Sequence, residues 1–266
     1  MKDNFYIFCY LDILGYKDLV NSYADDDEAV TKLEEFLNIS IFYMYDGFRN
    51  IRTGIKGDLE TKAILDSIKI SLISDSILIR MPVSVGTNID SKRDSTIAIQ
   101  ACLYFVSFLI LTFITNIGLF LRGGISIGQH YEKVLKHDSM FIFSKSLIRA
   151  YQLEQKASSI RILIDSILIN FLADNNKDFT LEQHKENFYL DVDGELCLDY
   201  YDILHCEGMI NTFLERVLEV VALNVARNKD NQRVLSKYET FEKYHNDKVL
   251  KKFKLPEYTS EIKVIV

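Results

Sequence analysis

The sequence has only two prolines, Pro82 and Pro256, so it contains no proline-rich linker. It also lacks an excess of positive charge, because 31 Lys and Arg face 38 Asp and Glu, a formal net charge of −7. Binding to DNA or RNA requires a basic face, so nucleic acid is not expected as a partner. A small phosphate ligand stays possible, since a metal ion can supply the missing positive charge.

Cysteine pairs with metal-ligand spacing are also missing. None of the four cysteines stands in a CxxC motif, and most have apolar neighbours; they are Cys9, Cys102, Cys197 and Cys206. Zinc sites and disulfides are therefore disfavoured, and buried, reduced thiols in a cytoplasmic protein are expected. No signal peptide is predicted, because Asp12 breaks the first apolar run and no small-residue cleavage site follows.

One uncharged stretch is long enough to cross a bilayer, from Ala101 to Leu121. It is interrupted by Asn116-Ile117-Gly118, which is typical of a turn. We therefore expect two buried elements here, a helix over about 94–115 and a strand over about 118–127, and no stable membrane insertion. A membrane-anchored protein is the alternative, and recovery in the soluble fraction without detergent would exclude it.

The order of predicted elements indicates an α+β domain. Helical spacing is predicted over 16–23, 28–48, 144–157, 166–171, 207–227 and 231–252, and strands over 5–11, 140–143 and 160–164. Hairpins are predicted over 67–81 and 187–201, and residues 49–65 read as a loop. This order predicts a ferredoxin-like (split βαβ) fold with a mostly antiparallel sheet. Residues 1–175 would form this domain, and 176–266 a C-terminal extension packed on it.

Two carboxylates stand out by position. Asp12 ends the first predicted strand, and Asp75 lies in the turn of the hairpin over 67–81. These strands are adjacent in a ferredoxin-like sheet, so the two side chains can converge, and they would repel unless a cation lay between them. Mg²⁺ and Mn²⁺ prefer such oxygen ligands. The alternative is that Asp12 caps a helix and Asp75 is only a turn residue.

Two further features point to a phosphate ligand. Leu14-Gly15-Tyr16 follows a buried strand and opens a helix, where free N–H groups can hold phosphate. Arg122 is a charge within an otherwise apolar strand and requires an anionic partner, either an acidic side chain or a triphosphate. Tyr10 either contacts a nucleotide or is a core tyrosine.

Four segments together resemble the class III nucleotidyl cyclases, in order and in spacing, over roughly the first 160 residues. They are FCYLDILGYKD (8–18), LISDSILI (72–79), LRGGISIG (121–128) and FIFSKSLIRAYQLEQKA (141–157). The resemblance implies that Asp12, Asp75 and the Ile13 carbonyl hold two Mn²⁺ or Mg²⁺ ions, that Arg122 acts near the phosphates, and that the enzyme is a homodimer with interfacial active sites.

The sequence departs from this family at three positions. Ser71 stands where the family usually has a base-reading lysine, four residues before the second aspartate. Ile148 and Gln152 replace the usual ribose-orienting Asn and phosphate-binding Arg, and the nearby Lys145 and Arg149 are possible substitutes.

This divergent form is most similar to the pyrimidine cyclases of bacterial Pycsar antiphage systems. The resemblance implies conversion of a pyrimidine nucleoside triphosphate, UTP before CTP, to a cyclic monophosphate that activates a separate effector. The alternatives are an adenylate cyclase and a catalytically dead nucleotide-binding sensor. A diguanylate cyclase is disfavoured because the GG[DE]EF motif is absent.

Overall fold

The computed structural model describes residues 5–23, 26–39, 41, 45–46, 59–83, 91–136, 139–175, 187–202 and 210–259. The strands are β1 (Phe5–Ile13), β2 (Lys69–Ile73), β3 (Ser76–Pro82), β4 (Leu121–Val134), β5 (Met140–Ser144), β6 (Ile162–Ile164), β7 (Phe188–Leu190) and β8 (Leu196–Leu198). The α-helices are α1 (Tyr16–Tyr23), α2 (Asp27–Asn38), α4 (Leu59–Asp66), α5 (Ser91–Thr112), α6 (Lys145–Lys156), α7 (Ser166–Asn175), α9 (Ile210–Arg227) and α10 (Gln232–Asp247). Shorter helical turns cover Phe113–Ile117, Lys248–Phe253 and Pro256–Tyr258.

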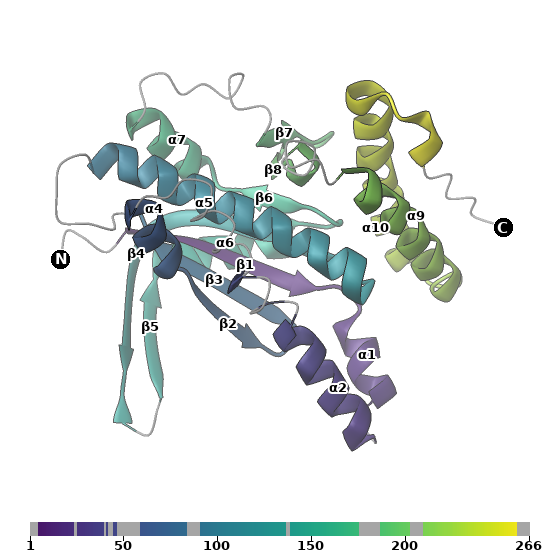
Figure 1. Ribbon diagram of the computed structural model, residues 1–266, viewed down its shortest axis with the longest axis horizontal. Helices are drawn as coiled ribbons and strands as arrows, with labels where there is room; N and C mark the ends of the chain where they lie inside the picture. Colours follow the sequence, from purple (N-terminus) through teal and green to yellow (C-terminus); the bar gives the residue numbers. More distant parts are fainter. Residues whose placement is uncertain are drawn as a thin grey trace.

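The strands form one sheet in the order β2-β3-β1-β4-β6-β8-β7, and β5 pairs with β4 outside this path. β1 is antiparallel to both β3 and β4, and β3 is antiparallel to β2, whereas β6 runs parallel to β4. The order β2-β3-β1-β4 is that of a split βαβ sheet. The predicted α+β, ferredoxin-like fold with a mostly antiparallel sheet is therefore confirmed (Figure 1).

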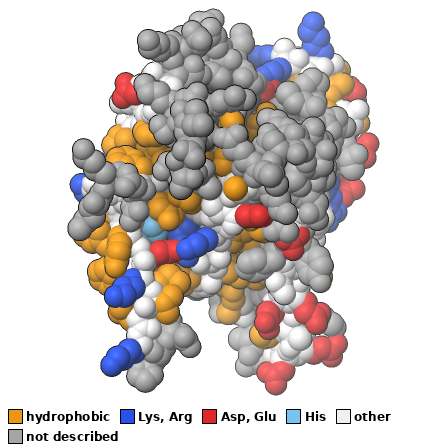
Figure 2. Space-filling view, turned by 60° about the vertical axis from the view of Figure 1, so that its left-hand side comes forward, with side chains coloured by type: hydrophobic (Ala, Val, Ile, Leu, Met, Phe, Trp, Pro, Cys, Tyr) orange, Lys and Arg blue, Asp and Glu red, His pale blue; other side chains and the backbone are white. Residues whose placement is uncertain are grey.

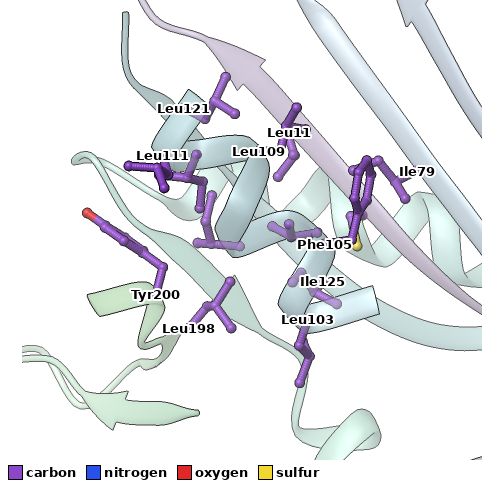
Figure 3. Close-up of a cluster of buried hydrophobic side chains, with 14 of the residues drawn as sticks. Leu11, Ile79, Leu103, Phe105, Leu109, Leu111, Leu121, Ile125, Leu198 and Tyr200 are labelled. Atoms are coloured by element: carbon purple, nitrogen blue, oxygen red, sulfur yellow. The ribbon is translucent and has the colours of Figure 1, made fainter. Parts of the chain in front are cut away.

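β1 lies inside this sheet, and its two faces have different chemistry because successive side chains point to opposite sides. Ile7, Leu11 and Ile13 belong to the large core that also contains α5. Phe8 and Tyr10 point to the other face, where they pack with Ala150 of α6. Helices thus cover the sheet on both sides (Figures 1 and 3).

The apolar helix predicted over 94–115 is α5, which lies across the sheet. Ser95–Ile117 has the length and composition of a membrane span, but most of its apolar window is buried inside the protein. Leu103, Phe105 and Leu109 are at most 2% exposed and pack toward β1 and β4 (Figure 3). This burial agrees with the expected core helix.

Several boundaries differ from the sequence-based prediction. Of the loop predicted over 49–65, residues 59–65 belong to helix α4, which the buried Ile64 and Leu65 hold against the core; residues 49–58 lie outside the described part. The strand predicted over 118–127 is instead β4, which continues to Val134 because β5 pairs with its distal half. β4 and β5 thus form an arm that projects from the sheet (Figure 1).

The two predicted hairpins are present, and the described cysteines are free thiols. Ser74 adopts a left-handed φ of 55° between β2 and β3, and Gly194 a φ of 80° between β7 and β8. The β7–β8 hairpin continues the sheet through β6. Cys9, Cys102 and Cys197 are buried and free, as expected, whereas Cys206 lies outside the described residues.

Helix α6 approaches β4 closely because glycines leave room for it. A Cβ at Gly124 would lie 2.4 Å from the Ala150 carbonyl oxygen and 2.4 Å from the Leu153 Cβ. At Gly128 the nearest atom would be 3.3 Å away. α6 begins after the N-cap Ser144, whose side chain accepts a hydrogen bond from the Leu147 amide. Gly124 therefore sets the position of α6.

We predict that Gly124→Ala lowers the free energy of unfolding by roughly 3 kcal/mol, because backbone atoms of α6 must move. The control Gly128→Ala should cost less than about 1 kcal/mol, since its contacts require only a small adjustment. Urea denaturation of both variants measures the difference. Equal losses would show that α6 is not held by close contact at Gly124.

Candidate active site

Asp12 lies near the end of β1, on the sheet face that α6 covers. In the strand register it is paired with Ser76 on β3 and with Arg122 on β4. Its side chain is 17% exposed. Because β1 is hydrogen-bonded along both edges, the position of this carboxylate is set by the sheet.

Asp75 is brought to the same place by the β2–β3 turn. The Ile13 amide donates a 2.8 Å hydrogen bond to the Asp75 backbone carbonyl. This bond joins the hairpin turn to the end of β1, one residue after Asp12. The structure therefore brings together the two acidic residues that the sequence singled out.

Arg122 lies between two carboxylates. Its Nε donates to Asp12 Oδ2 at 2.8 Å, and its Nη2 lies 2.8 Å from Glu154 Oε1. Its Nη1 also donates to the Ala157 carbonyl at 3.4 Å. The sequence left open whether Arg122 pairs with an acidic side chain or a phosphate; in the structure its partners are acidic side chains.

Glu154 is the site residue that the sequence reasoning missed. It lies on α6 and is 2% exposed. Burial raises the pKa of Glu154, the charge of Arg122 lowers it, and the charges of Asp12 and Asp75 raise it further. A signal was present, because Glu154 falls on the apolar stripe between Ala150 and Ala157. An acidic residue on a buried helix face requires a cationic partner.

Tyr10 connects to Asp75 through a serine. Its hydroxyl lies 2.8 Å from Ser76 Oγ, which donates to Asp75 Oδ1 at 3.4 Å. The Tyr10 ring packs edge-on against Tyr151 at 5.2 Å. Burial raises the Tyr10 pKa, against the effect of the Ser76 hydrogen bond. Tyr10 is therefore half-buried beside the acidic pair, on the same face as Asp12.

The turn after β1 has the predicted strand–glycine–helix form. Gly15 has a φ of 85°, and α1 begins at Tyr16. The Leu14 amide is already engaged, since it donates to the Phe120 carbonyl at 2.9 Å. Of the three amides expected to hold phosphate, those of Gly15 and Tyr16 thus remain for that role.

The charges of this site favour a cation. Among the described residues, Arg122 is the one cation that pairs with Asp12 and Glu154, and Asp75 has no ion-pair partner. No group of three or more His, Cys, Asp or Glu placed to hold a metal ion occurs in the described part of the chain. Two aspartates that the backbone holds at one end of β1, with unbalanced charge, still fit a divalent ion that takes its other ligands from water and phosphate oxygens.

The positions that depart from the cyclase pattern lie on α6 and β2. Ile148 is 58% exposed, and Gln152 is also exposed. Of the two possible substitutes, Arg149 donates to the Ile127 carbonyl at 3.3 Å, whereas Lys145 is exposed. Ser71 accepts a 2.9 Å hydrogen bond from Arg80.

Arg80 belongs to a second charged cluster at the base of the β4–β5 arm. Its Nε donates to Glu132 Oε2 at 2.7 Å, and Lys69 also pairs with Glu132. Burial raises the pKa of Glu132, but hydrogen bonds from Lys69 and Arg80 prevail and lower it to about 2. These residues line a cavity of about 530 Å³ together with the buried His130.

We predict that Arg122→Met lowers the free energy of unfolding at pH 7 by about 3 kcal/mol, because it leaves the buried Glu154 carboxylate unpaired. The pKa of Glu154, already raised by burial, should rise further. A carboxyl with a raised folded-state pKa stabilises the fold when protonated. The loss of unfolding free energy should therefore be small below about pH 4.5 and grow as the pH rises through the folded-state pKa of Glu154.

The double variant Arg122→Met/Glu154→Gln is the control, since it removes the unpaired carboxylate of Glu154 and should recover much of the lost unfolding free energy at pH 7. Denaturation between pH 4 and pH 8 tests both. A deficit independent of pH, or no recovery in the double variant, would contradict the ion-pair account.

Comparison with known proteins gave matches among solved structures alone: no family description and no curated protein matches this chain. The adenylyl cyclase CyaB from P. aeruginosa is 17% identical, with 65% of this chain and 82% of that chain covered and a TM-score of 0.40. The monomeric guanylyl cyclase domain of the RhoGC fusion protein from Blastocladiella emersonii is 15% identical, with 73% and 94% covered and a TM-score of 0.43.

A class III adenylyl cyclase-like ATP-binding protein from Pseudomonas aeruginosa is also similar, at 12% identity and a TM-score of 0.45, with 77% of this chain and 40% of that chain covered. The solved structures to which this chain is similar thus include cyclase domains, at low identity. A functional assignment therefore depends on the residues of the site.

Proposed function

We propose that this protein is a metal-dependent nucleotidyl cyclase, which converts a nucleoside triphosphate to a 3′,5′-cyclic monophosphate and pyrophosphate. The observation that carries the proposal is the 2.8 Å bond from the Ile13 amide to the Asp75 backbone carbonyl, which joins the β2–β3 turn to β1 one residue after Asp12. Paired carboxylates with excess negative charge are suited to Mg²⁺ or Mn²⁺, which in turn bind triphosphates.

In this mechanism the carboxylates of Asp12 and Asp75 and the backbone carbonyl of Ile13 would hold two Mn²⁺ or Mg²⁺ ions. When bound, these ions lower the pKa of the 3′-hydroxyl and neutralise charge on the phosphates. The ribose 3′-oxygen forms a bond to the α-phosphorus, and the bond from that phosphorus to the departing pyrophosphate breaks. A carboxylate of the pair accepts the proton released from the 3′-hydroxyl.

The other site residues have supporting roles in this proposal. Arg122 holds the Asp12 carboxylate in place through their 2.8 Å hydrogen bond and balances Glu154. From this position it also offsets negative charge that develops near the phosphates. The Gly15 and Tyr16 amides at the start of α1 receive phosphate oxygens, and Tyr10 borders the nucleotide.

The projecting arm supports a homodimer. Its exposed apolar residues Tyr131, Phe141 and Phe143 share one face, which we call the arm patch, and Val134 and Met140 lie on the opposite face. Hydrophobic side chains gather on this projection in Figure 2. Such a patch on an exposed hairpin is typical of an interaction surface. We propose that it pairs with a second copy, so that the active sites form at the interface.

Pyrimidine specificity is the finer part of the proposal. It rests on the resemblance and on Ser71, which replaces the lysine that usually reads the base. Arg80 donates to Ser71 and supplies a different cation at that place. We favour UTP, with CTP and ATP as alternatives, and a role in cytoplasmic antiviral signalling through a separate effector that binds the cyclic product.

A second candidate function is a nucleotide-binding sensor without turnover. It is favoured by the exposed Ile148 and Gln152, which leave α6 without the usual ribose and phosphate contacts. Nucleotide binding without formation of a cyclic product would identify this case.

We predict that the wild-type protein, incubated with Mn²⁺ and each ribonucleoside triphosphate separately, forms cyclic UMP fastest. Asp75→Asn should lower turnover by at least about 100-fold, because it removes a metal ligand while leaving the turn intact. The control is Asp174→Asn at an exposed position on α7, which should be as active as wild type. Turnover that survives Asp75→Asn would contradict the mechanism, and faster cyclisation of ATP or GTP would contradict pyrimidine specificity.

We also predict that Phe143→Glu, which places a charge in the arm patch, gives a monomer in light scattering and loses cyclase activity. Phe143 is 61% exposed, so the fold should tolerate the change. The control Leu223→Glu alters a residue on α9 that is 48% exposed and should leave the dimer intact. A dimer in both variants would show that the arm patch is not the interface.

A further inference from the structure

Helix α10, in the C-terminal extension, is anchored directly beside the candidate active site. The rings of Tyr238 and Phe241 pack against Phe120, with centroids 5.6 and 4.9 Å apart. The Phe120 carbonyl accepts the hydrogen bond from Leu14, and Arg122 follows two residues later on β4. Phe120 thus connects α10 to both β1 and β4 at the site.

Two cations lie on α10 next to this anchor. Arg233 and Lys237 are four residues apart, so they occupy the same stripe of the helix. Lys237 directly precedes the buried Tyr238 and is itself half-buried. Neither cation has a hydrogen bond or ion pair from its side chain to another described residue, in contrast to Lys248 and Lys252, which pair with Asp199 and Asp202.

Lys237 lies within electrostatic reach of the site. Burial lowers its pKa, and Arg122 and Arg233 lower it further, whereas Asp12 and Glu154 raise it. Its ammonium group is therefore close enough to sense both carboxylates without being paired to either.

This arrangement is unfavourable for the fold alone. Like charges one turn apart destabilise a helix, and a partly desolvated ammonium without a partner costs free energy. A bound anion would offset both costs. An anion bound by the acidic pair through divalent ions would extend its phosphates beside Arg122, toward α10.

We propose that Lys237, with Arg233 behind it, binds the terminal phosphates of the triphosphate, so that the C-terminal extension completes the active site. The inference rests on the proposed function of Asp12 and Asp75. It gives the extension a definite task, to add positive charge to that of Arg122 where the pyrophosphate leaves.

The test is binding of inorganic tripolyphosphate in the presence of Mn²⁺, measured by calorimetry on the full chain. We expect Lys237→Gln to weaken binding roughly 10- to 100-fold, the effect of losing a charged hydrogen bond. The matched control is Lys243→Gln, an exposed lysine on the same helix, which should change the Kd by less than about twofold. Lys237→Met should weaken binding equally but leave the Tm unchanged or higher, because it removes a partly desolvated charge.

Unchanged tripolyphosphate binding by Lys237→Gln would overturn the inference, as would a lower Tm in Lys237→Met, which indicates a structural role. Faster turnover in Lys237→Gln would also overturn it, because α10 would then be inhibitory. If wild type binds tripolyphosphate through Lys237 but forms no cyclic nucleotide, this inference stands and the proposed function fails. If wild type forms cyclic nucleotide but Lys237→Gln binds tripolyphosphate as tightly, the proposed function stands and this inference fails.

Discussion

Hydrogen bonding of β1 along both edges is the constraint on which the candidate site depends. This strand is paired with β3 on one side and β4 on the other over most of its length. Its register brings Asp12, the β2–β3 turn and Arg122 into one place, although they are about 60 and 110 residues apart in the chain. A slip of one residue would turn Asp12 into the core and Arg122 away from it.

The guanidinium of Arg122 then stabilises the negative charge gathered at this end of β1. Arg122 is shared between a carboxylate on β1 and one on α6, so it links the sheet to the helix as well as balancing charge. Buried ion pairs add little net stability but are costly to break. Asp75 has no ion-pair partner among the described residues, so this end of β1 retains negative charge that a bound cation would balance.

Features set by residues close together in the sequence could be predicted from it, whereas those set by contacts between distant segments could not. Asp12, Asp75 and the hairpin around Ser74 were found because strand ends and turns have local signals. Glu154 was missed because its partner lies on another element, and α4 because its only signals are Ile64 and Leu65 in a polar segment. The full β4–β5 arm was not predicted, since its strands are stabilised by pairing with each other and leave Phe141 and Phe143 exposed. The position of α10 depends on packing against Phe120, more than 100 residues earlier, and no local pattern encodes that contact.

The contact between Phe120 and Phe241 has a consequence for synthesis on the ribosome. Phe120 is made more than 100 residues before α10, and its ring is buried in the folded protein. Until α10 emerges, the side of the Phe120 ring that α10 covers stays exposed, and exposed apolar surface on a nascent chain promotes aggregation. The same delay means that the helix carrying Lys237 can pack beside Phe120 only after more than 100 further residues have been made.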